Sequence, residues 1–291
     1  MTAEDLVDDA PLPPPAIYDT GRFGKVRIVA RHCPLCEAGE GEPIAGYGAQ
    51  IWRLVRCRGC GFVYLDHAPE YDALVDDMAW EKTGAAELER RAATRPISYR
   101  LSRATRLRMR LLPRKRMAEL VARHARPGNV VDLGCGTGGQ LAGLAPVFVP
   151  FGIEISAVAA AEADRIFRAR GGAAVNRPAL DGLRSFSEGF FSAATLRSYL
   201  EHELHPRAVL AELGRVLAPD GVAIVKVPNY ASLNRRIAGP KWCGYRYPDH
   251  LNYFTPASLS AMAAKCGFSA RFGPTGRLPT SDNMYALLTK R

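Results

Sequence analysis

The sequence lacks both a long hydrophobic run and a basic leader at its start. Its longest apolar segment, residues 141–153, has thirteen residues and two prolines, whereas a helix that crosses a bilayer needs roughly 20 residues. The first fifteen residues, MTAEDLVDDAPLPPP, carry acids and prolines where a signal peptide carries basic and apolar residues. These absences predict a cytoplasmic protein without a membrane span, whose residues 1–21 form a flexible tail.

Cysteine occurs seven times, but its spacing does not suit disulfides. Four cysteines lie in two tight pairs, CPLC (Cys33, Cys36) and CRGC (Cys57, Cys60), which are separated by twenty residues. Each C-x₂-C pair can bind a tetrahedral ion from one turn, and two pairs complete a closed four-sulfur zinc site with no open position. The pattern predicts a structural zinc ribbon over residues 22–68. The alternative is a redox dithiol, which would not need a second copy.

Acidic residues are scarce between positions 95 and 126. This segment holds eleven Lys or Arg and a single acid, Glu119, in a chain whose net charge is +10. Such a run can bind phosphates of a nucleic acid or of a charged substrate, and it is equally compatible with a solvated helix face. Its apolar spacing, interrupted by Pro96 and Pro113, predicts helical pieces, so residues 69–126 are expected to form a helical linker or cap.

From residue 127 to 291, short apolar strands alternate with helical patterns. The predicted strands are 129–133, 151–155, 173–175, 191–196 and 221–227, followed by two more around SARFG and MYALLT. This alternation is typical of an α/β protein with a parallel sheet wrapped by helices. The expected fold is therefore a doubly wound, seven-stranded Rossmann-like sheet, preceded by the small zinc ribbon and the helical cap.

A glycine-rich loop follows the first of these strands and is expected to open a helix. In VVDLGCGTGG, residues 130–139, Gly134, Gly136 and Gly138 allow a tight turn and let a ligand approach the backbone. The spacing fits both a dinucleotide and a methyl donor. Asp132 favours the second, because a carboxylate would repel a pyrophosphate but attract the cationic S-adenosylmethionine. Glu154, which ends the next strand, can accept both hydroxyls of a ribose.

These motifs make the chain from about residue 115 resemble a class I S-adenosylmethionine-dependent methyltransferase. The resemblance rests on DLGCGTG, on GIEIS and on VLAELGRVLAPDGVAIVKVPN. The later GPKWCGYRYPDHLNYFTPASLSAMAAKCGF is similar to a branch from bacterial polysaccharide and natural-product pathways, and the cysteine block resembles a zinc-binding segment attached to some of its members. The resemblance implies that residues 127–291 form the methyltransferase domain. The expected cofactor-binding residues are Asp132, Gly134, Cys135, Gly136, Gly138, Glu154, Asp181 and Arg197.

Asp181 departs from the family pattern. The family often has an acid directly after the third strand, whereas this chain reads NRPALDGL there, so Asp181 would hold the adenine from a shifted position, or a backbone group would do so.

The candidate catalytic residues lie in SYLEHELHP, residues 198–206, and at His250. HELH is one residue short of the zinc-protease pattern H-E-x-x-H, so that type of metal site is excluded. The resemblance places Glu201 and His202 beside the methyl donor. His202 would act as a base or hold the acceptor, or its role would be structural; a base is needed only for an acceptor such as a hydroxyl.

The acceptor is predicted to be a small molecule from a sugar, lipid-linked or natural-product pathway. YRYPDHLNYF, residues 245–254, can form either a pocket wall or a packed loop, and four nearby cations, Arg235, Arg236, Lys241 and Arg246, suit an anionic acceptor. One alternative is an RNA methyltransferase that uses the ribbon and the basic segment, although the N-P-P-Y and D-P-P-Y motifs are missing. Another is a non-catalytic scaffold that contains a zinc ribbon.

Overall fold

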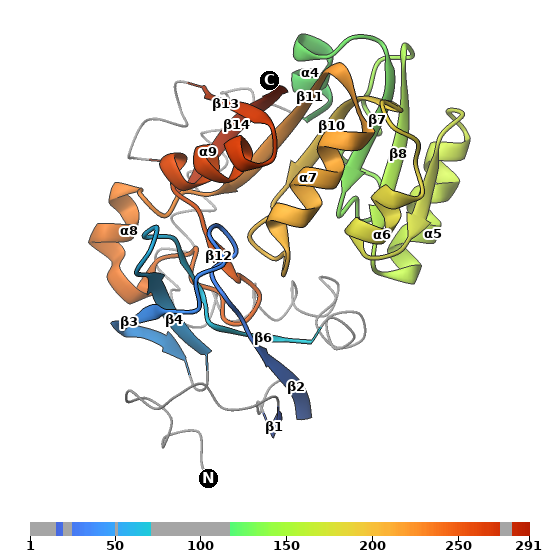
Figure 1. The fold of residues 1–291 in the computed structure, drawn as a ribbon. Helices are drawn as coiled ribbons and strands as arrows, with labels where there is room; N and C mark the ends of the chain where they lie inside the picture. Colours follow the sequence, from blue (N-terminus) through green and yellow to red (C-terminus); the bar gives the residue numbers. More distant parts are fainter. Residues whose placement is uncertain (1–15, 20–24, 50–51, 71–116, 274–280) are drawn as a thin grey trace, which may run out of the picture.

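The computed structural model describes residues 16–19, 25–49, 52–70, 117–273 and 281–291 (Figure 1). The N-terminal strands are β1 (Ala16–Asp19), β2 (Lys25–Ala30), β3 (Gly41–Ala49), β4 (Trp52–Cys57), β5 (Val63–Leu65) and β6 (His67–Pro69). The later strands are β7 (Gly128–Leu133), β8 (Phe148–Glu154), β9 (Ala173–Asn176), β10 (Phe191–Arg197), β11 (Leu217–Pro228), β12 (Asn252–Tyr253), β13 (Phe268–Phe272) and β14 (Asn283–Lys290). The helices are α4 (Met117–His124), α5 (Ala157–Arg168), α6 (Ala179–Arg184), α7 (Pro206–Val216), α8 (Leu233–Ala238), the 3₁₀ turn η3 (Gly239–Lys241) and α9 (Pro256–Lys265).

The central sheet has seven strands in the order β13-β14-β11-β10-β7-β8-β9. The five strands from β11 to β9 pair in parallel, and β14 runs antiparallel to both β11 and β13. This arrangement confirms the predicted doubly wound sheet and all seven predicted strands. The chain winds outward in one direction from β7 and in the other from β10, so the strand order reverses between these two. Ligands of open α/β sheets bind at the carboxyl ends of the strands at such a point.

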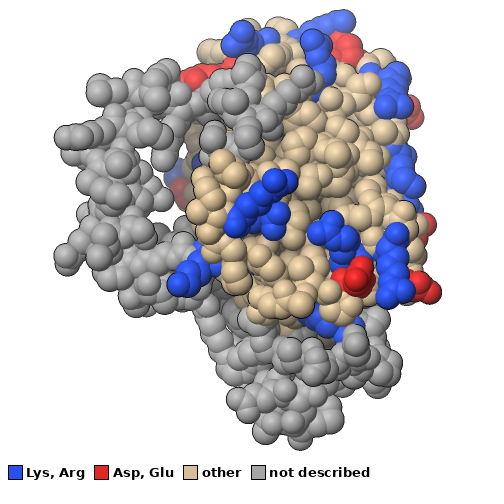
Figure 2. All heavy atoms as spheres, turned by 90° about the vertical axis from the view of Figure 1, so that its left-hand side faces the viewer, with Lys and Arg blue, Asp and Glu red and all other residues tan. Residues whose placement is uncertain are grey.

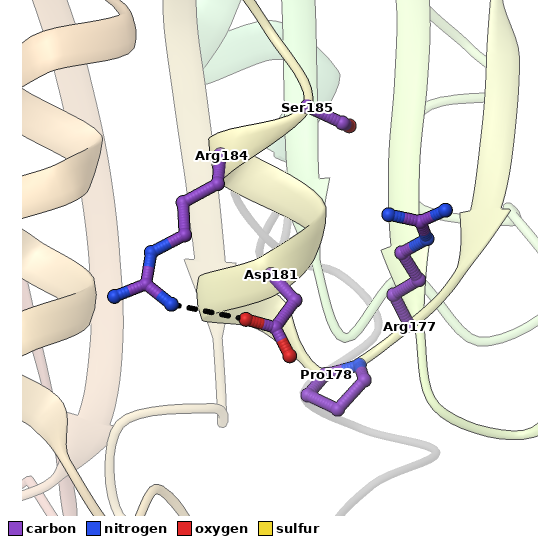
Figure 3. Close-up of a pocket in the computed structure, with 5 residues that line it drawn as sticks. All are labelled: Arg177, Pro178, Asp181, Arg184 and Ser185. Atoms are coloured by element: carbon purple, nitrogen blue, oxygen red, sulfur yellow. Dashed lines mark hydrogen bonds and ion pairs between the residues drawn. The ribbon is translucent and has the colours of Figure 1, made fainter.

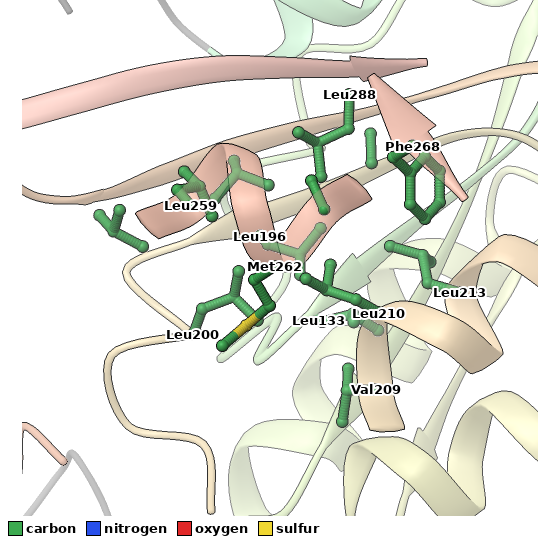
Figure 4. Packing of buried hydrophobic residues seen from close by; sticks show 14 of the residues in the cluster. Leu133, Leu196, Leu200, Val209, Leu210, Leu213, Leu259, Met262, Phe268 and Leu288 are labelled. Atoms are coloured by element: carbon green, nitrogen blue, oxygen red, sulfur yellow. The ribbon is translucent and has the colours of Figure 1, made fainter. Parts of the chain in front are cut away.

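Helices cover both faces of the sheet. Helices α4 and α5 pack on one face through Met117, Val121 and Phe167. On the other face, α6, α7 and α9 bury their apolar sides, and Figure 4 shows apolar side chains of α7 and α9 in the same buried cluster as those of the strands. Helix α9 begins with a capping box in which Thr255 and Ser258 satisfy each other's backbone N–H. The two layers hold the carboxyl ends of β7 and β10 in fixed positions.

The glycine-rich loop does not open a helix, so that expectation is wrong. Residues 134–147 form turns between β7 and β8. The segment contains five glycines and Pro146 within fourteen residues, and both residue types disfavour a helix interior. Any ligand on this loop would therefore meet backbone N–H groups and side chains, with no helix dipole behind them.

The N-terminal strands form two small antiparallel sheets, β1-β2-β6 and β12-β5-β4-β3. β12 comes from the C-terminal half of the chain, and its Asn252 and Tyr253 pair with Tyr64 and Val63 of β5. The ring of Phe62 also meets that of Phe254 with centroids 5.3 Å apart. Buried residues of this region and of the central sheet form one continuous core. The N-terminal sheets are thus built into the wall of the larger fold.

Most of the predicted helical cap lies outside the described residues, which contain its last part, as α4, and its first two residues, of which Pro69 belongs to β6. The boundaries predicted for the tail, ribbon, cap and methyltransferase domain stay predictions. Among the described helices, none is long and apolar enough to cross a membrane.

Candidate active site

The glycine-rich loop presents open backbone at the carboxyl end of β7. Gly134, Gly136 and Gly138 have φ values of +67°, +52° and +81°, a region that favours glycine. A Cβ added at Gly136 would meet no atom within 4 Å. Cys135, between them, turns its side chain into the core and is only 4% exposed, so this residue can offer a ligand its backbone only. The loop thus keeps a space beside Gly136 that a ligand can enter.

Asp132 lies beneath this loop and is 1% exposed. Its Oδ1 accepts a hydrogen bond of 2.6 Å from the Thr195 hydroxyl on β10, and its Oδ2 has no partner. Burial raises the pKa of Asp132 from its ordinary value of 3.8 to about 7, against the opposing effects of the Thr195 bond and the Arg197 charge. A buried carboxylate with an unpaired oxygen suits a cationic ligand. Thr195 was not among the predicted site residues, although it is the one polar residue in the apolar stretch AATL.

Glu154 ends β8 and lies beside the same loop. One carboxylate oxygen accepts the N–H of Gly136 at 2.8 Å, and the other accepts the N–H of Ser156 at 3.0 Å. Each oxygen can accept a further bond. The carboxylate is therefore fixed at the loop with room to accept further hydrogen bonds, and its binding to the two hydroxyls of a ribose stays a prediction.

The two remaining predicted cofactor residues are exposed. Asp181, in the first turn of α6, pairs with Arg184 at 3.1 Å (Figure 3). Both line a surface hollow of about 470 Å³ beyond the end of β9, together with Arg177, Pro178 and Ser185. Arg197 ends β10, and its charge lowers the pKa of Asp132, as described above. Asp181 is thus exposed beyond the end of β9 and already has an ionic partner, and its contact with adenine stays a prediction.

The segment that follows β10 lies against the glycine-rich loop. A Cβ added at Gly134 would approach Tyr199 Cδ2 to 2.9 Å. Residues 199–205 form turns, and α7 starts at Pro206 with His205 as its N-cap. His205 is exposed, so it is a loop residue. The contact between Gly134 and Tyr199 makes the candidate cofactor loop and the candidate catalytic segment two walls of one site.

Glu201, His202 and His250 come together, although His250 is 48 residues further along the chain. One ligand atom from each lies within 4.8 Å of the others, and the two imidazole rings meet edge to face with centroids 4.7 Å apart. Burial raises the pKa of Glu201 to about 7, and the charges of Lys226 and Arg246 oppose the shift. Burial together with the charge of Arg246 lowers the pKa of His202 to about 4. His202 is therefore neutral near pH 7 and can accept a proton or bind a cation.

Two of the four predicted acceptor-binding cations point into the fold. Arg246 donates to Asp249 at 2.9 Å, and Arg235 stacks over the ring of Tyr230 at 4.2 Å. Arg236 and Lys241 are exposed. A further cation, the half-buried Lys226 on β11, was not predicted and donates to the Ser198 hydroxyl at 3.0 Å. Lys226 and Arg246 are thus the positive side chains that act on Glu201.

The aromatic residues of 245–254 are mostly packed in the core. Tyr245, Tyr253 and Phe254 are each at most 6% exposed, and Tyr245 contacts Tyr47 of the N-terminal strands at 5.2 Å between centroids. Of the two interpretations of residues 245–254, a pocket wall or a packed loop, these rings fit the packed loop. The segment's contribution to the site is His250.

Arg31 connects the N-terminal strands to both candidate catalytic segments, residues 198–206 and 245–254. Its guanidinium donates to the carbonyl oxygens of Leu65, Leu251 and Leu204 and to Asn252 Oδ1, at 2.9–3.2 Å. Arg31 is 7% exposed. The partners lie 34 to 221 residues away in the chain, so no local pattern could have identified Arg31. Its contacts fix the turn that bears Glu201 and His202 against the segment that bears His250.

The four paired cysteines meet in one cluster. Cys33 and Cys60 sulfurs are 3.5 Å apart, those of Cys36 and Cys57 are 3.4 Å apart, and all four lie within 4.8 Å of one another. Zinc–sulfur bonds of ~2.3 Å give a tetrahedron with edges of about 3.8 Å. Each pair closes with the same turn, in which the N–H of Glu37 or Gly61 donates to the carbonyl of the first cysteine. The donor set and spacing fit a structural zinc ion.

The sheet topology and the open glycine-rich loop define a Rossmann-like protein that binds a small cofactor. A model of the methyltransferase-domain family matches residues 103–271, more than half of the chain. The chain belongs to this family and is an S-adenosylmethionine-dependent methyltransferase.

Solved structures with a similar fold include three S-adenosylmethionine-dependent methyltransferases. The Thermotoga maritima protein is 19% identical, with 60% of this chain and 88% of that chain covered and a TM-score of 0.46. The Archaeoglobus fulgidus protein is 16% identical, with 60% and 93% covered and a TM-score of 0.46. The Methanosarcina mazei protein is 18% identical, with 59% and 96% covered and a TM-score of 0.43. Identities and TM-scores this low do not establish a family. Membership of the family therefore rests on the match of residues 103–271 to the family model. No curated protein matched the chain.

The residues at the carboxyl edge fit S-adenosylmethionine in charge and space. The unpaired Oδ2 of Asp132 and the space at Gly136 suit a cationic, backbone-bound ligand, and Glu154 suits its ribose. When bound, S-adenosylmethionine supplies an activated methyl group on a sulfonium. The protein's part in such a displacement is mainly to bind and align the two reactants.

Proposed function

We propose that this methyltransferase acts on a small, negatively charged acceptor, such as a sugar, lipid-linked or natural-product intermediate. In this proposal the predicted residues at the glycine-rich loop hold S-adenosylmethionine, and the four-cysteine cluster holds a structural zinc ion. We place the enzyme in the cytoplasm, where cysteine thiols stay reduced and free to bind metal.

The burial of the candidate acceptor groups carries the proposal. Glu201 is 1% exposed and His250 is 5% exposed. The backbone N–H groups of Leu251 and Asn252 donate to the Glu201 carbonyl at 2.7 and 3.1 Å. These bonds hold the segment that bears His250 against Glu201. Small ligands are held by a few polar groups in fixed positions of this kind. Lys226 and Arg246 supply the positive charge that would attract an anion.

The described surface offers less support for RNA as the acceptor. On the face shown in Figure 2, Lys and Arg side chains stand in separate groups among uncharged residues, with acids beside some of them. Most of the basic run 95–126 lies outside the described residues, and Arg126 at its end forms an ion pair with Asp220.

Methyl-transfer assays can decide between these acceptors. Zinc-replete protein and S-adenosylmethionine labelled in the methyl group would be incubated with a panel of nucleoside diphosphate sugars and, separately, with total RNA. We expect label in a small, nuclease-resistant product, and a higher KM for the acceptor in Arg246→Met. The matched control is Arg236→Met, at an exposed arginine. Label in RNA, with an affinity that falls steeply with salt, would overturn the proposal.

A further inference from the structure

The cluster of Glu201, His202 and His250 has the composition of a metal site, apart from the four cysteines. The two segments that supply it are far apart in the chain, yet one ligand atom of each residue lies within 4.8 Å of the others. We propose that these three side chains bind a divalent cation through two imidazoles and one carboxylate. The pattern H-E-x-x-H fails here on spacing, but the fold brings in the second histidine from position 250 instead.

The orientation of both imidazoles favours metal binding. His202 Nδ1 lies 2.7 Å from the carbonyl oxygen of Asp249, and His250 Nδ1 lies 2.8 Å from that of Gly244. A carbonyl oxygen can only accept, so both Nδ1 atoms carry the proton. In a neutral ring the lone pair then sits on Nε2. Histidines that bind metals make this same outer bond, which fixes the ring and its tautomer.

The carboxylate contributes a second, independent indication of a ligand. Glu201 is 1% exposed, and its Oε2 has no hydrogen-bond partner. Burying an unpaired carboxylate oxygen is costly, and such atoms in native proteins call for an unseen ion or water. The Glu201 carbonyl also accepts the N–H groups of Leu251 and Asn252. These bonds fix the glutamate relative to His250, as a preorganised site requires.

The charges around the cluster allow a cation to bind. Lys226 and Arg246 are the positive groups that act on Glu201. Arg246 is paired with Asp249 at 2.9 Å, and Lys226 donates to Ser198 at 3.0 Å. Two positive side chains, Lys226 and Arg246, are thus balanced by two carboxylates, those of Glu201 and Asp249, before any metal is added.

The donor set selects the class of metal. Imidazole nitrogens suit zinc, cobalt, iron and nickel better than magnesium or calcium, which prefer oxygen. Bonds of about 2.0–2.1 Å would bring tetrahedral donors to about 3.3 Å from one another, so donors that now lie up to 4.8 Å apart would close by at most about 1.5 Å. Three protein ligands leave at least one position open. An oxygen of the acceptor could occupy it, and this last step rests on the proposed function.

Cobalt titration of untagged protein that holds one equivalent of zinc tests the proposal without cofactor or acceptor, so its outcome is independent of the methyl-transfer assay. Zinc holds thiolate sites more tightly than cobalt, so added Co²⁺ should leave the four cysteines occupied by zinc. We expect one equivalent of Co²⁺ to bind by calorimetry, with visible d–d bands and without sulfur-to-cobalt charge transfer.

Variants identify the ligands. Glu201→Gln and His250→Ala should each weaken cobalt binding at least tenfold, and His205→Ala, at an exposed histidine of the same turn, should not. Thermal unfolding would verify that each variant is folded. If Glu201→Gln does not fold, His202→Asn carries the same test, because His202 is only partly buried. The absence of cobalt binding in folded wild-type protein, or wild-type affinity in folded Glu201→Gln or His202→Asn, would overturn the proposal.

Discussion

Replacing Asp132 with asparagine should stabilise the ligand-free protein at alkaline pH and, at the same time, weaken its binding of S-adenosylmethionine. The carboxyl group is buried, with Oδ1 bonded to Thr195 and Oδ2 unpaired. Asparagine has nearly the same shape, and its oxygen can still accept the Thr195 hydroxyl. The substitution therefore removes the charge and leaves the packing in place.

The magnitude follows from the pKa of Asp132, which burial raises from 3.8 to about 7. For an acid whose folded-state pKa is raised, the protonated form contributes stability that is fully present below pH 3.8 and is lost as pH rises through 7. Between pH 5 and pH 8 this linkage lowers the unfolding free energy of the wild type by about 2.5 kcal/mol. The asparagine variant has no such group, so its advantage should grow by that amount.

Urea denaturation of both proteins at pH 5 and pH 8, without ligand, measures this difference. Using the change between two pH values cancels any constant effect of the substitution. The charged groups that act on Asp132, Arg197 and Glu154, are the same in both proteins. A stability gap that is equal at the two pH values would refute the argument that Asp132 is a buried, strained carboxylate. Equal affinity of the two proteins for S-adenosylmethionine would refute its role in attracting the cationic ligand.

Three further substitutions test the other parts of the site. Cys60→Ser should remove about one equivalent of zinc and lower the melting temperature, because the cysteine cluster shares a core with the sheet; unchanged zinc content would exclude the four-sulfur site. Arg31→Lys should lose at least one of the four hydrogen bonds, because lysine has three N–H donors, destabilise the protein by about 1.5–3 kcal/mol and lower kcat with little change in cofactor affinity. Arg56→Lys, at an exposed position, is its control, and equal kcat values would refute the positioning role. Glu154→Gln should weaken S-adenosylmethionine binding about tenfold by calorimetry, since a charge-assisted bond is worth about 1.5 kcal/mol, and an unchanged affinity would contradict the ribose assignment.

The sheet could be predicted from the sequence because its signals are local. Each strand is a short apolar run bounded by turn residues. Asp132 is the last residue but one of β7, and Glu154 is the last residue of β8. The two cysteines of each pair are separated by two residues because each pair lies in a tight turn, and this spacing is visible in the sequence. Sites that are built from a few neighbouring residues can therefore be predicted from the sequence.

Other features depend on residues that are distant in the sequence. The partners of Arg31 and the approach of His250 to Glu201 arise because β12 pairs with β5, and no pattern along the chain encodes that pairing. The missing helix after the glycine-rich loop has a different cause. The general pattern of the fold predicts a helix there, but the glycines and Pro146 of this chain favour turns.

Calorimetric titration of zinc-replete protein with S-adenosylmethionine tests the central claim most directly. The account predicts saturable binding of one molecule per chain, competition by S-adenosylhomocysteine, and a marked loss of affinity in Asp132→Ala. The absence of binding by folded, zinc-replete protein would contradict it, and unchanged affinity in Asp132→Ala would show that the cofactor does not depend on the carboxylate beneath the glycine-rich loop.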